Sequence, residues 1–206
     1  MRIPVIASLN GHTGESWLKF AHIIEQAGAD ALEFNYYGVA PALTVSSAAL
    51  EEQLISAVRS LTQAISIPMA VKLTPFYTAF GHVAAALDRA GASGLVLFNR
   101  FYQPDVNTRT MTLVPQAELS TSAELPLRLH WLALLAGADV VQLVSALLRH
   151  GPGHIGAMQD ALERWLEWQH LDSLTGMIGR ASFEASPDPN AIEPAHYIRT
   201  LQNWTR

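Results

Sequence analysis

The feature that most constrains the fold is an Ala-Gly-Ala segment that occurs three times between an apolar helix pattern and an apolar strand pattern. The copies are Ile23–Asn35 (IIEQAGADALEFN), Leu87–Asn99 (LDRAGASGLVLFN) and Leu134–Ser145 (LLAGADVVQLVS). In each copy a glycine (Gly28, Gly91 or Gly137) follows the helix, where the chain needs a left-handed backbone that a Cβ would oppose. The next strand is almost wholly apolar, as parallel strands buried on both faces are. The repeat therefore predicts stacked βα units.

The same periodicity predicts five strands, at Ile3–Asn10, Ala31–Tyr36, Pro68–Leu73, Gly94–Asn99 and Asp139–Val144. Helices are expected at Glu15–Ala27, Ala48–Ala64, Ala79–Ala90, Pro126–Leu135 and Ile155–Gln169, with a final short helix at Ala195–Trp204. The helix over 155–169 has an apolar face, which we expect to pack against the rest of the domain.

Alternating strands and helices favour either a closed barrel or an open doubly wound sheet. The sequence contains no G-x-G-x-x-G motif and no P-loop, so a dinucleotide-binding sheet has no specific support. A complete barrel has eight strands and about 250 residues. The prediction is an α/β fold of the (β/α) TIM-barrel type that is incomplete, with about five parallel strands. One domain is expected over residues 1–206, with C-terminal helices and a tail from about residue 155.

Composition excludes several classes of partner. The net charge is −5 and no Lys/Arg cluster occurs, so nucleic acid and anionic membranes are not expected. The absence of cysteine excludes disulfides and thiol catalysis. The sequence lacks an apolar stretch of about 18 residues, so we expect no membrane span and a cytoplasmic location. His150 and His154 are separated by Gly-Pro-Gly, and the other histidines are dispersed, so no metal site is expected.

Polar residues end most of the predicted strands. They are Asn10, Asn35, Lys72, Asn99 and Ser145. In a β/α barrel the carboxyl ends of the strands form the active site. A single asparagine at a strand end is most simply a turn former, but several at equivalent strand ends favour a site.

Lys72 is one of two lysines in the chain and lies inside a strand that is expected to be buried. Because a charged amine is costly to bury without an anionic partner, two interpretations are open. Lys72 forms a salt bridge with Glu33 across the barrel, or it binds an anionic or electron-rich ligand. Alternation places Lys72 on the face opposite Val71 and Leu73, which should face the helices.

Five segments resemble the dihydroorotate dehydrogenase-like group of FMN-dependent barrels. They are IPVIASLNG, AGADALEFNYY, IPMAVKLTPF, GLVLFNRFYQPD and LLAGADVVQLVSALLRHG, and the resemblance extends to the C-terminal YIRTLQNW. It implies noncovalent FMN and oxidation of the small molecule dihydroorotate to orotate in pyrimidine biosynthesis, by hydride transfer to the flavin. By match to the motif, Lys72 and Asn35 would contact the flavin and Ser145 would lie near its phosphate. Asn99 and Asn10 would contact the substrate.

The sequence departs from this family in three places, which leaves a second interpretation open. The family's first strands are missing. In addition, LHWLA is followed directly by LLAGAD, without the strand and the Gly-Gly phosphate loop that lie between these segments in the family. After Asn35 the chain has Tyr36 and Tyr37 where active enzymes carry a Ser or Cys base, so Tyr37 is the nearest candidate base. The alternative is therefore a truncated barrel without flavin or catalysis that forms homo-oligomers through open strand edges. A phosphate-ligand barrel enzyme of another family is a third possibility, against which the missing phosphate loop argues.

Overall fold

The computed structural model describes residues 3–10, 14–38, 42–100, 105–114, 119–135 and 137–180, together with Ser182, Ala185 and Gln202. The chain divides into two compact units, Met1–Gln116 (unit 1) and Ala117–Arg206 (unit 2). The organisation of residues 1–206 as one barrel domain stays a prediction. The expected final helix at Ala195–Trp204 lies outside the described residues, apart from Gln202.

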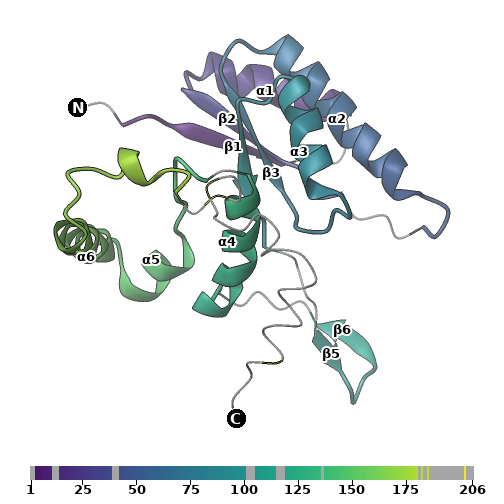
Figure 1. Cartoon of the computed structure of the whole chain (residues 1–206). Coiled ribbons are helices and arrows are strands. Elements are labelled where there is room, and N and C mark those ends of the chain that lie inside the picture. The colour runs from purple at the N-terminus through teal and green to yellow at the C-terminus, as the bar shows by residue number, and fades with distance from the viewer. Residues whose placement is uncertain are drawn as a thin grey trace. The chain divides into compact units, whose positions relative to one another are not determined.

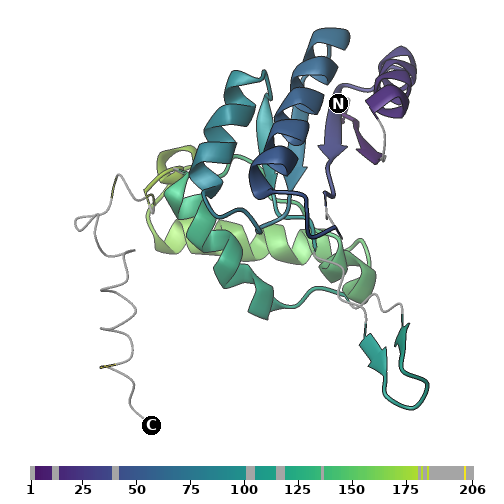
Figure 2. The same ribbon diagram turned by 90° about the vertical axis from the view of Figure 1, so that its right-hand side faces the viewer.

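Unit 1 is built on a four-stranded parallel sheet. Its strands are β1 (Ile6–Asn10), β2 (Ala31–Asn35), β3 (Met69–Leu73) and β4 (Gly94–Leu97), in the spatial order β1-β2-β3-β4. They alternate with the helices α1 (Gly14–Gln26), α2 (Ser47–Ala64) and α3 (Phe80–Arg89), of which α2 and α3 lie over one face of the sheet in Figure 2. The predicted parallel α/β architecture is confirmed in this unit.

The strand order distinguishes a barrel-type sheet from a doubly wound one. Parallel strands are joined by right-handed crossovers, so four strands in sequential order place their helices on the same face. A doubly wound sheet instead reverses its order at a switch point. The sequential order in unit 1, whose strands β1, β2 and β3 are labelled in Figure 1, is consistent with a segment of a barrel. Within the described ranges β1 pairs only with β2 and β4 only with β3, so this segment is not closed.

The core of unit 1 lies between the sheet and its helices. Val71 and Leu73 are fully buried, as alternation along β3 predicts, and Phe34 occupies the equivalent face of β2. Leu54, Val58 and Leu61 of α2 are also buried, at the spacing of one helical face. Burying one such side chain stabilises the folded state by about 1.5–3 kcal/mol. This apolar layer therefore helps to hold the strands in register.

The three glycines of the repeat adopt the predicted left-handed conformation. Their φ angles are +86° at Gly28, +99° at Gly91 and +122° at Gly137. At Gly91 a Cβ would also meet the hydroxyl of Thr62 at 3.1 Å, so both the conformation and the space favour glycine. Unit 1 ends in an unpredicted hairpin of β5 (Asp105–Asn107) and β6 (Thr112–Val114).

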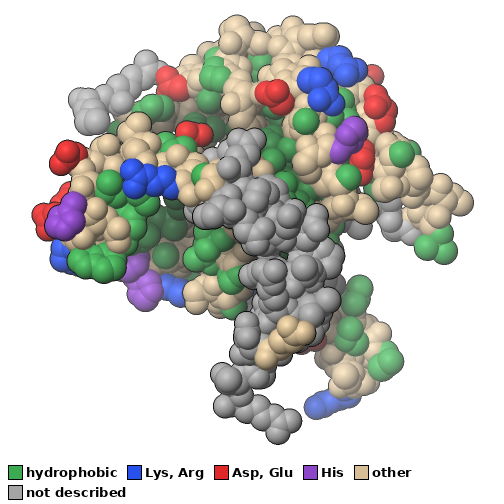
Figure 3. Space-filling model, in the orientation of Figure 1, with side chains coloured by type: hydrophobic (Ala, Val, Ile, Leu, Met, Phe, Trp, Pro, Cys, Tyr) green, Lys and Arg blue, Asp and Glu red, His purple; other side chains and the backbone are tan. Residues whose placement is uncertain are grey.

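Unit 2 is helical in its described residues. It contains the short helices η1 (Ser122–Glu124) and η2 (Thr175–Met177) and the helices α4 (Leu125–Leu134), α5 (Ser145–His150) and α6 (His154–Trp168). Helices predicted at 126–135 and 155–169 are confirmed. The apolar face of α6 is largely exposed, however, and hydrophobic side chains reach the surface where α5 and α6 lie (left of Figure 3).

The prediction of a fifth strand at Asp139–Val144 is wrong. Residues 139–144 have no regular structure, and Val140 and Val141 are each 77% exposed. A parallel strand exists only through hydrogen bonds to a neighbour, and unit 2 has no strand among its described residues. The apolar sequence alone was therefore insufficient to form this strand.

Candidate functional site

The predicted polar residues of unit 1 share one face of its sheet. The register pairs Asn10 with Asn35 and Asn35 with Lys72, so these three side chains form a row across β1, β2 and β3. Ser8 and Glu33 form the row before it. Asn99 follows β4, and its backbone N–H donates to the Leu73 carbonyl at 2.7 Å. This face is the one opposite the buried Phe34 and Val71, and it is polar because no helix of the sequential crossovers covers it.

Glu33 holds Lys72 in place. The Lys72 Nζ lies 3.3 Å from Glu33 Oε1, and the Ser8 hydroxyl donates to the same oxygen at 3.1 Å. The two side chains are 22% and 9% exposed, respectively, so the carboxylate is buried and its charge is compensated by the amine. The expected salt bridge is therefore present. An ammonium has three N–H donors, so this pairing leaves Lys72 able to donate to a ligand as well.

Asn35 and Asn99 lie on either side of Lys72. The Asn99 amide nitrogen donates to Asn35 Oδ1 at 2.8 Å, which joins the end of β2 to the segment after β4. Lys72 lies on β3, the strand between them. Asn35 and Asn99 therefore meet, with Lys72 on the strand between them, and these side chains present amide and ammonium groups that can bind the edge of a polar ring.

Aromatic residues that the sequence reasoning missed pack away from this row, against the buried rings of Phe34 and Phe80. Trp17 of α1 packs edge-on against Phe34 and Tyr36, with ring centroids 5.1 and 6.1 Å apart. Its indole nitrogen is buried and has no hydrogen-bond partner in the described structure. Tyr77 lies 6.0 Å from Phe80 between ring centroids. The segment LTPFYTAF directly after Lys72 was the available signal for Tyr77.

Burial raises the pKa of two tyrosines in this cluster. Burial raises the pKa of Tyr36. Burial, with a smaller contribution from Tyr36, raises the pKa of Tyr77 to about 12. Neither phenol is therefore a base near neutral pH. Tyr37, the sequence-based candidate base, is partly exposed.

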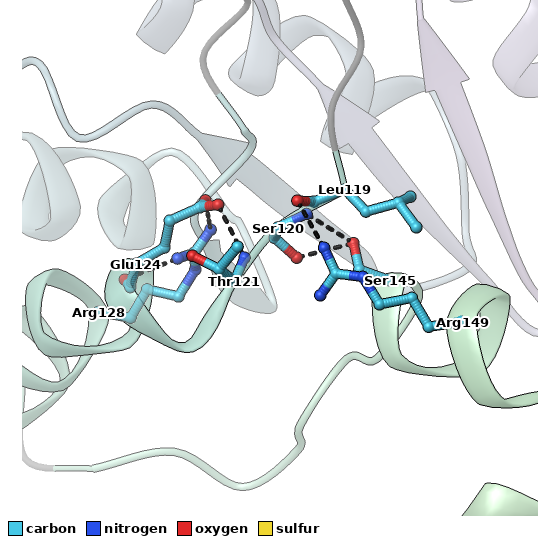
Figure 4. A network of polar contacts seen from close by, with 7 residues as sticks. All are labelled: Leu119, Ser120, Thr121, Glu124, Arg128, Ser145 and Arg149. Atoms are coloured by element: carbon cyan, nitrogen blue, oxygen red, sulfur yellow. Dashed lines mark hydrogen bonds and ion pairs between the residues drawn. The ribbon is translucent and has the colours of Figure 1, made fainter.

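Ser145 belongs to unit 2 and begins α5 instead of ending a strand. Its hydroxyl accepts hydrogen bonds from the Ser120 backbone N–H at 3.0 Å and from the Ser120 hydroxyl at 2.7 Å. Arg149 of the same helix donates to the Leu119 carbonyl at 3.0 Å, so both contacts anchor α5 to the segment before η1 (Figure 4). Its expected role at a phosphate stays a prediction.

Other classes of site lack support in the described ranges. His150 and His154 stack with ring centroids 4.7 Å apart, but no three His, Asp or Glu side chains there form a possible metal site. No described helix is long and apolar enough to cross a membrane.

Comparison with known proteins agrees with the resemblance. The NAD-dependent dihydropyrimidine dehydrogenase subunit PreA of Escherichia coli is 24% identical over 89% of this chain and 54% of its own length. The catalytic subunit of dihydroorotate dehydrogenase B (NAD(+)) of Cutibacterium acnes is 30% identical over 78% of this chain and 52% of its own length. Dihydroorotate dehydrogenase A (fumarate) of Limosilactobacillus reuteri is 31% identical over 88% of this chain and 58% of its own length. No protein-family model matches the chain.

The length of the alignment shows whether a relative contains residues that this chain lacks. The alignment with PreA extends over 224 positions, more than the 206 residues of this chain, although it covers only 89% of it. PreA therefore has residues within the aligned region that this chain lacks. The chain spans about half the length of the curated relatives it matches. The curated homologues of this chain are thus dihydroorotate dehydrogenases and the dihydropyrimidine dehydrogenase subunit PreA.

Proposed function

We propose that the chain is a flavin oxidoreductase of the dihydroorotate dehydrogenase type, which binds FMN noncovalently and oxidises dihydroorotate to orotate. The observation that carries this proposal is the position of Lys72 between Asn35 and Asn99, with its amine held by the buried Glu33. The names of the relatives support the class of substrate, a small dihydropyrimidine.

The donor set fits the ring of a flavin. Bound FMN would accept a hydride from the substrate. Lys72 would place a positive charge and N–H donors at the electron-rich edge of the ring, where charge increases on reduction. Asn35 would hydrogen-bond the ring beside it, while Asn99 and Asn10 would orient the substrate. Ser145 is proposed to contact the phosphate.

The proton transfer requires a base beside the substrate. Tyr37 is the residue we propose to take the substrate proton, because it follows Asn35 at the place where the resemblance implies a Ser or Cys base. An exposed tyrosine is a poor base at neutral pH, so slow turnover is expected.

A second candidate function follows from the open sheet. If the phosphate contacts are lost, the chain would be a noncatalytic protein that forms homo-oligomers through the unpaired edges of β1 and β4. The retained group of Glu33, Lys72, Asn35 and Asn99 favours the flavin protein over this alternative.

The visible spectrum of the purified, desalted chain after incubation with FMN distinguishes the two functions. The proposal expects a flavin absorption band that is retained by wild type, lost in Lys72→Ala and retained in Lys19→Ala. Lys19 is the matched control because it is the other lysine and is exposed on α1. A wild-type protein that stays colourless would eliminate the flavin function.

Turnover is tested separately by orotate formation from dihydroorotate with an artificial electron acceptor. We expect slow formation by the FMN-loaded wild type and none by Lys72→Ala. Flavin binding without orotate formation would leave a flavoprotein with another substrate and would refute the proposed reaction.

A further inference from the structure

The two edge strands of the unit 1 sheet, β1 and β4, have sequences that suit pairing with a further strand. In the described ranges each of them has a neighbour on one side only. Neither β1 (IASLN) nor β4 (GLVL) contains a charged residue. Ile6 is 57% exposed, and Ile3 and Val5 before it are exposed as well. Edge strands of monomeric proteins are usually protected by lysine, proline or bulges, and Pro4, just ahead of β1, is the one such residue near this edge.

The strand count and order limit which partner fits these edges. Four parallel strands in sequential order, with their helices on one face, are half of an eight-stranded (β/α) barrel. A two-fold axis can relate two such halves if β1 of each copy meets β4 of the other, because all eight strands then run parallel. The two edges are thus complementary to each other in a second copy of the same sheet.

We propose that two copies of this chain close into one eight-stranded parallel barrel, with β1 of each copy paired to β4 of the other. The polar face then lines the barrel interior, and the Asn10–Asn35–Lys72 row of each copy lies at the same barrel end. Each site would be completed by strand ends from the partner copy. This inference names a second copy of the chain as the partner of both sheet edges, and it does not depend on flavin binding.

The polar face of the sheet also favours a closed barrel over packing of two sheets face to face. A sheet that presents Ser8, Glu33, Asn35 and Lys72 on one face has hydrogen-bonding groups where a sandwich would need apolar ones. The Glu33–Lys72 pair is already neutral as a unit, so enclosing it introduces no unpaired charge.

Cysteine cross-linking tests the pairing directly because the chain has no cysteine. Ile6→Cys on β1 and Val96→Cys on β4 lie on the same face of the sheet. Within one copy their strands are three strand spacings apart, about 14 Å, whereas a disulfide needs Cα atoms within about 7 Å. The two variants are unfolded, mixed without FMN, refolded and oxidised, with light scattering to measure the mass of the native particle.

The proposal expects a two-copy mass and a disulfide-linked dimer in the mixture but in neither variant alone. Cross-linking of Ile6→Cys with itself would instead indicate β1–β1 pairing and would overturn the proposal. A one-copy mass without cross-links would also overturn it, including the case in which Asp139–Val144 of the same chain occupies the β4 edge. Since FMN is absent, neither result bears on the flavin function.

A second set of variants covers the case in which the first does not refold. Val5→Cys and Leu95→Cys lie on the opposite face of the same two edges and carry the same expectation. Ile6→Lys places a charge at the β1 edge and should reduce the mass to one copy. Leu43→Lys, a charge on a fully exposed leucine before α2, is the matched control and should leave the two-copy mass unchanged.

Discussion

Units 1 and 2 carry the same kind of sequence but differ in what they bury. All buried apolar side chains of the described chain lie in unit 1, between Leu9 and Phe98. In unit 2 the corresponding residues of α4, α5 and α6 are half-buried or exposed. Both units contain the Ala-Gly-Ala repeat, with a left-handed glycine in each copy. The difference therefore arises after the glycine, at the strand.

The comparison separates local from nonlocal causes. A glycine adopts its left-handed conformation because of its own backbone and the helix before it. A parallel strand needs a neighbour, and β2 and β4 have β3 between them, whereas residues 139–144 have none among the described residues of unit 2. Within the described part of unit 2, the helices therefore have no sheet to supply an apolar layer.

The largest contrast should appear in the free energy of unfolding. Phe34→Ala removes a fully buried ring that contacts Trp17, and it should cost about 3–5 kcal/mol. Trp168→Ala, at a tryptophan that is 72% exposed in unit 2, should cost about 0.5 kcal/mol or less. Urea unfolding followed by circular dichroism measures both. Equal losses would show that the two units do not differ as described.

Two ion pairs, one in each unit, extend the comparison of the units. Glu33→Gln leaves the half-buried Lys72 without its counter-charge, so it should cost about 1–3 kcal/mol. Glu124→Gln disrupts the more exposed Arg128–Glu124 pair of unit 2, at 3.5 Å, and should cost less than about 1 kcal/mol. The same urea experiment applies, and a larger effect for Glu124→Gln would contradict the burial argument.

The glycines provide a smaller and more local test. Gly91→Ala forces a side chain into a left-handed conformation and against Thr62, so it should destabilise unit 1 by about 1–2 kcal/mol. Gly137→Ala should leave the hydrogen exchange of β2 and β3 unchanged, although it is strained in unit 2. Exchange measured by mass spectrometry reports each segment separately. Faster exchange in β2 and β3 of Gly137→Ala would mean that the units unfold together.

The smallest expected effect is a dependence on alkaline pH. Burial raises the pKa of Tyr77 to about 12, so the folded state favours the neutral phenol. This contribution is complete below the ordinary tyrosine pKa of about 10 and is lost as the pH rises from there through 12. Thermal unfolding between pH 9 and pH 12 should show a smaller loss for Tyr77→Phe than for wild type. An identical loss in both proteins would rule out Tyr77 as the group responsible.

Much of unit 1 was predictable because its signals are local or periodic. The strand positions, the glycine conformations and the orientation of Val71 and Leu73 follow from alternation and helix-end chemistry. The shared face of Asn35 and Lys72 follows from the same alternation, since parallel strands end at one edge. The hydrogen bond between Asn35 and Asn99 was not predictable, because it depends on how the chain turns after β4.

The errors have nonlocal causes. Asp139–Val144 has a strand sequence but no partner strand, and Ser145 consequently begins a helix. Trp17 and Tyr77 were overlooked because aromatic residues on helices and loops carry no periodic signal of a site. The place of Trp17 beside Phe34 depends on packing between α1 and β2, whereas Tyr77 lies beside Phe80 only three residues further along the chain.

The most direct test of the account is a titration of the protein into FMN, followed by quenching of the flavin fluorescence. The account predicts saturable binding by wild type and by Lys19→Ala, and binding by Lys72→Ala that is weaker by about tenfold or more, the loss of one charged hydrogen bond. Equal binding by Lys72→Ala and Lys19→Ala would contradict it, because the sheet would then bring Asn35, Lys72 and Asn99 together without creating a flavin site.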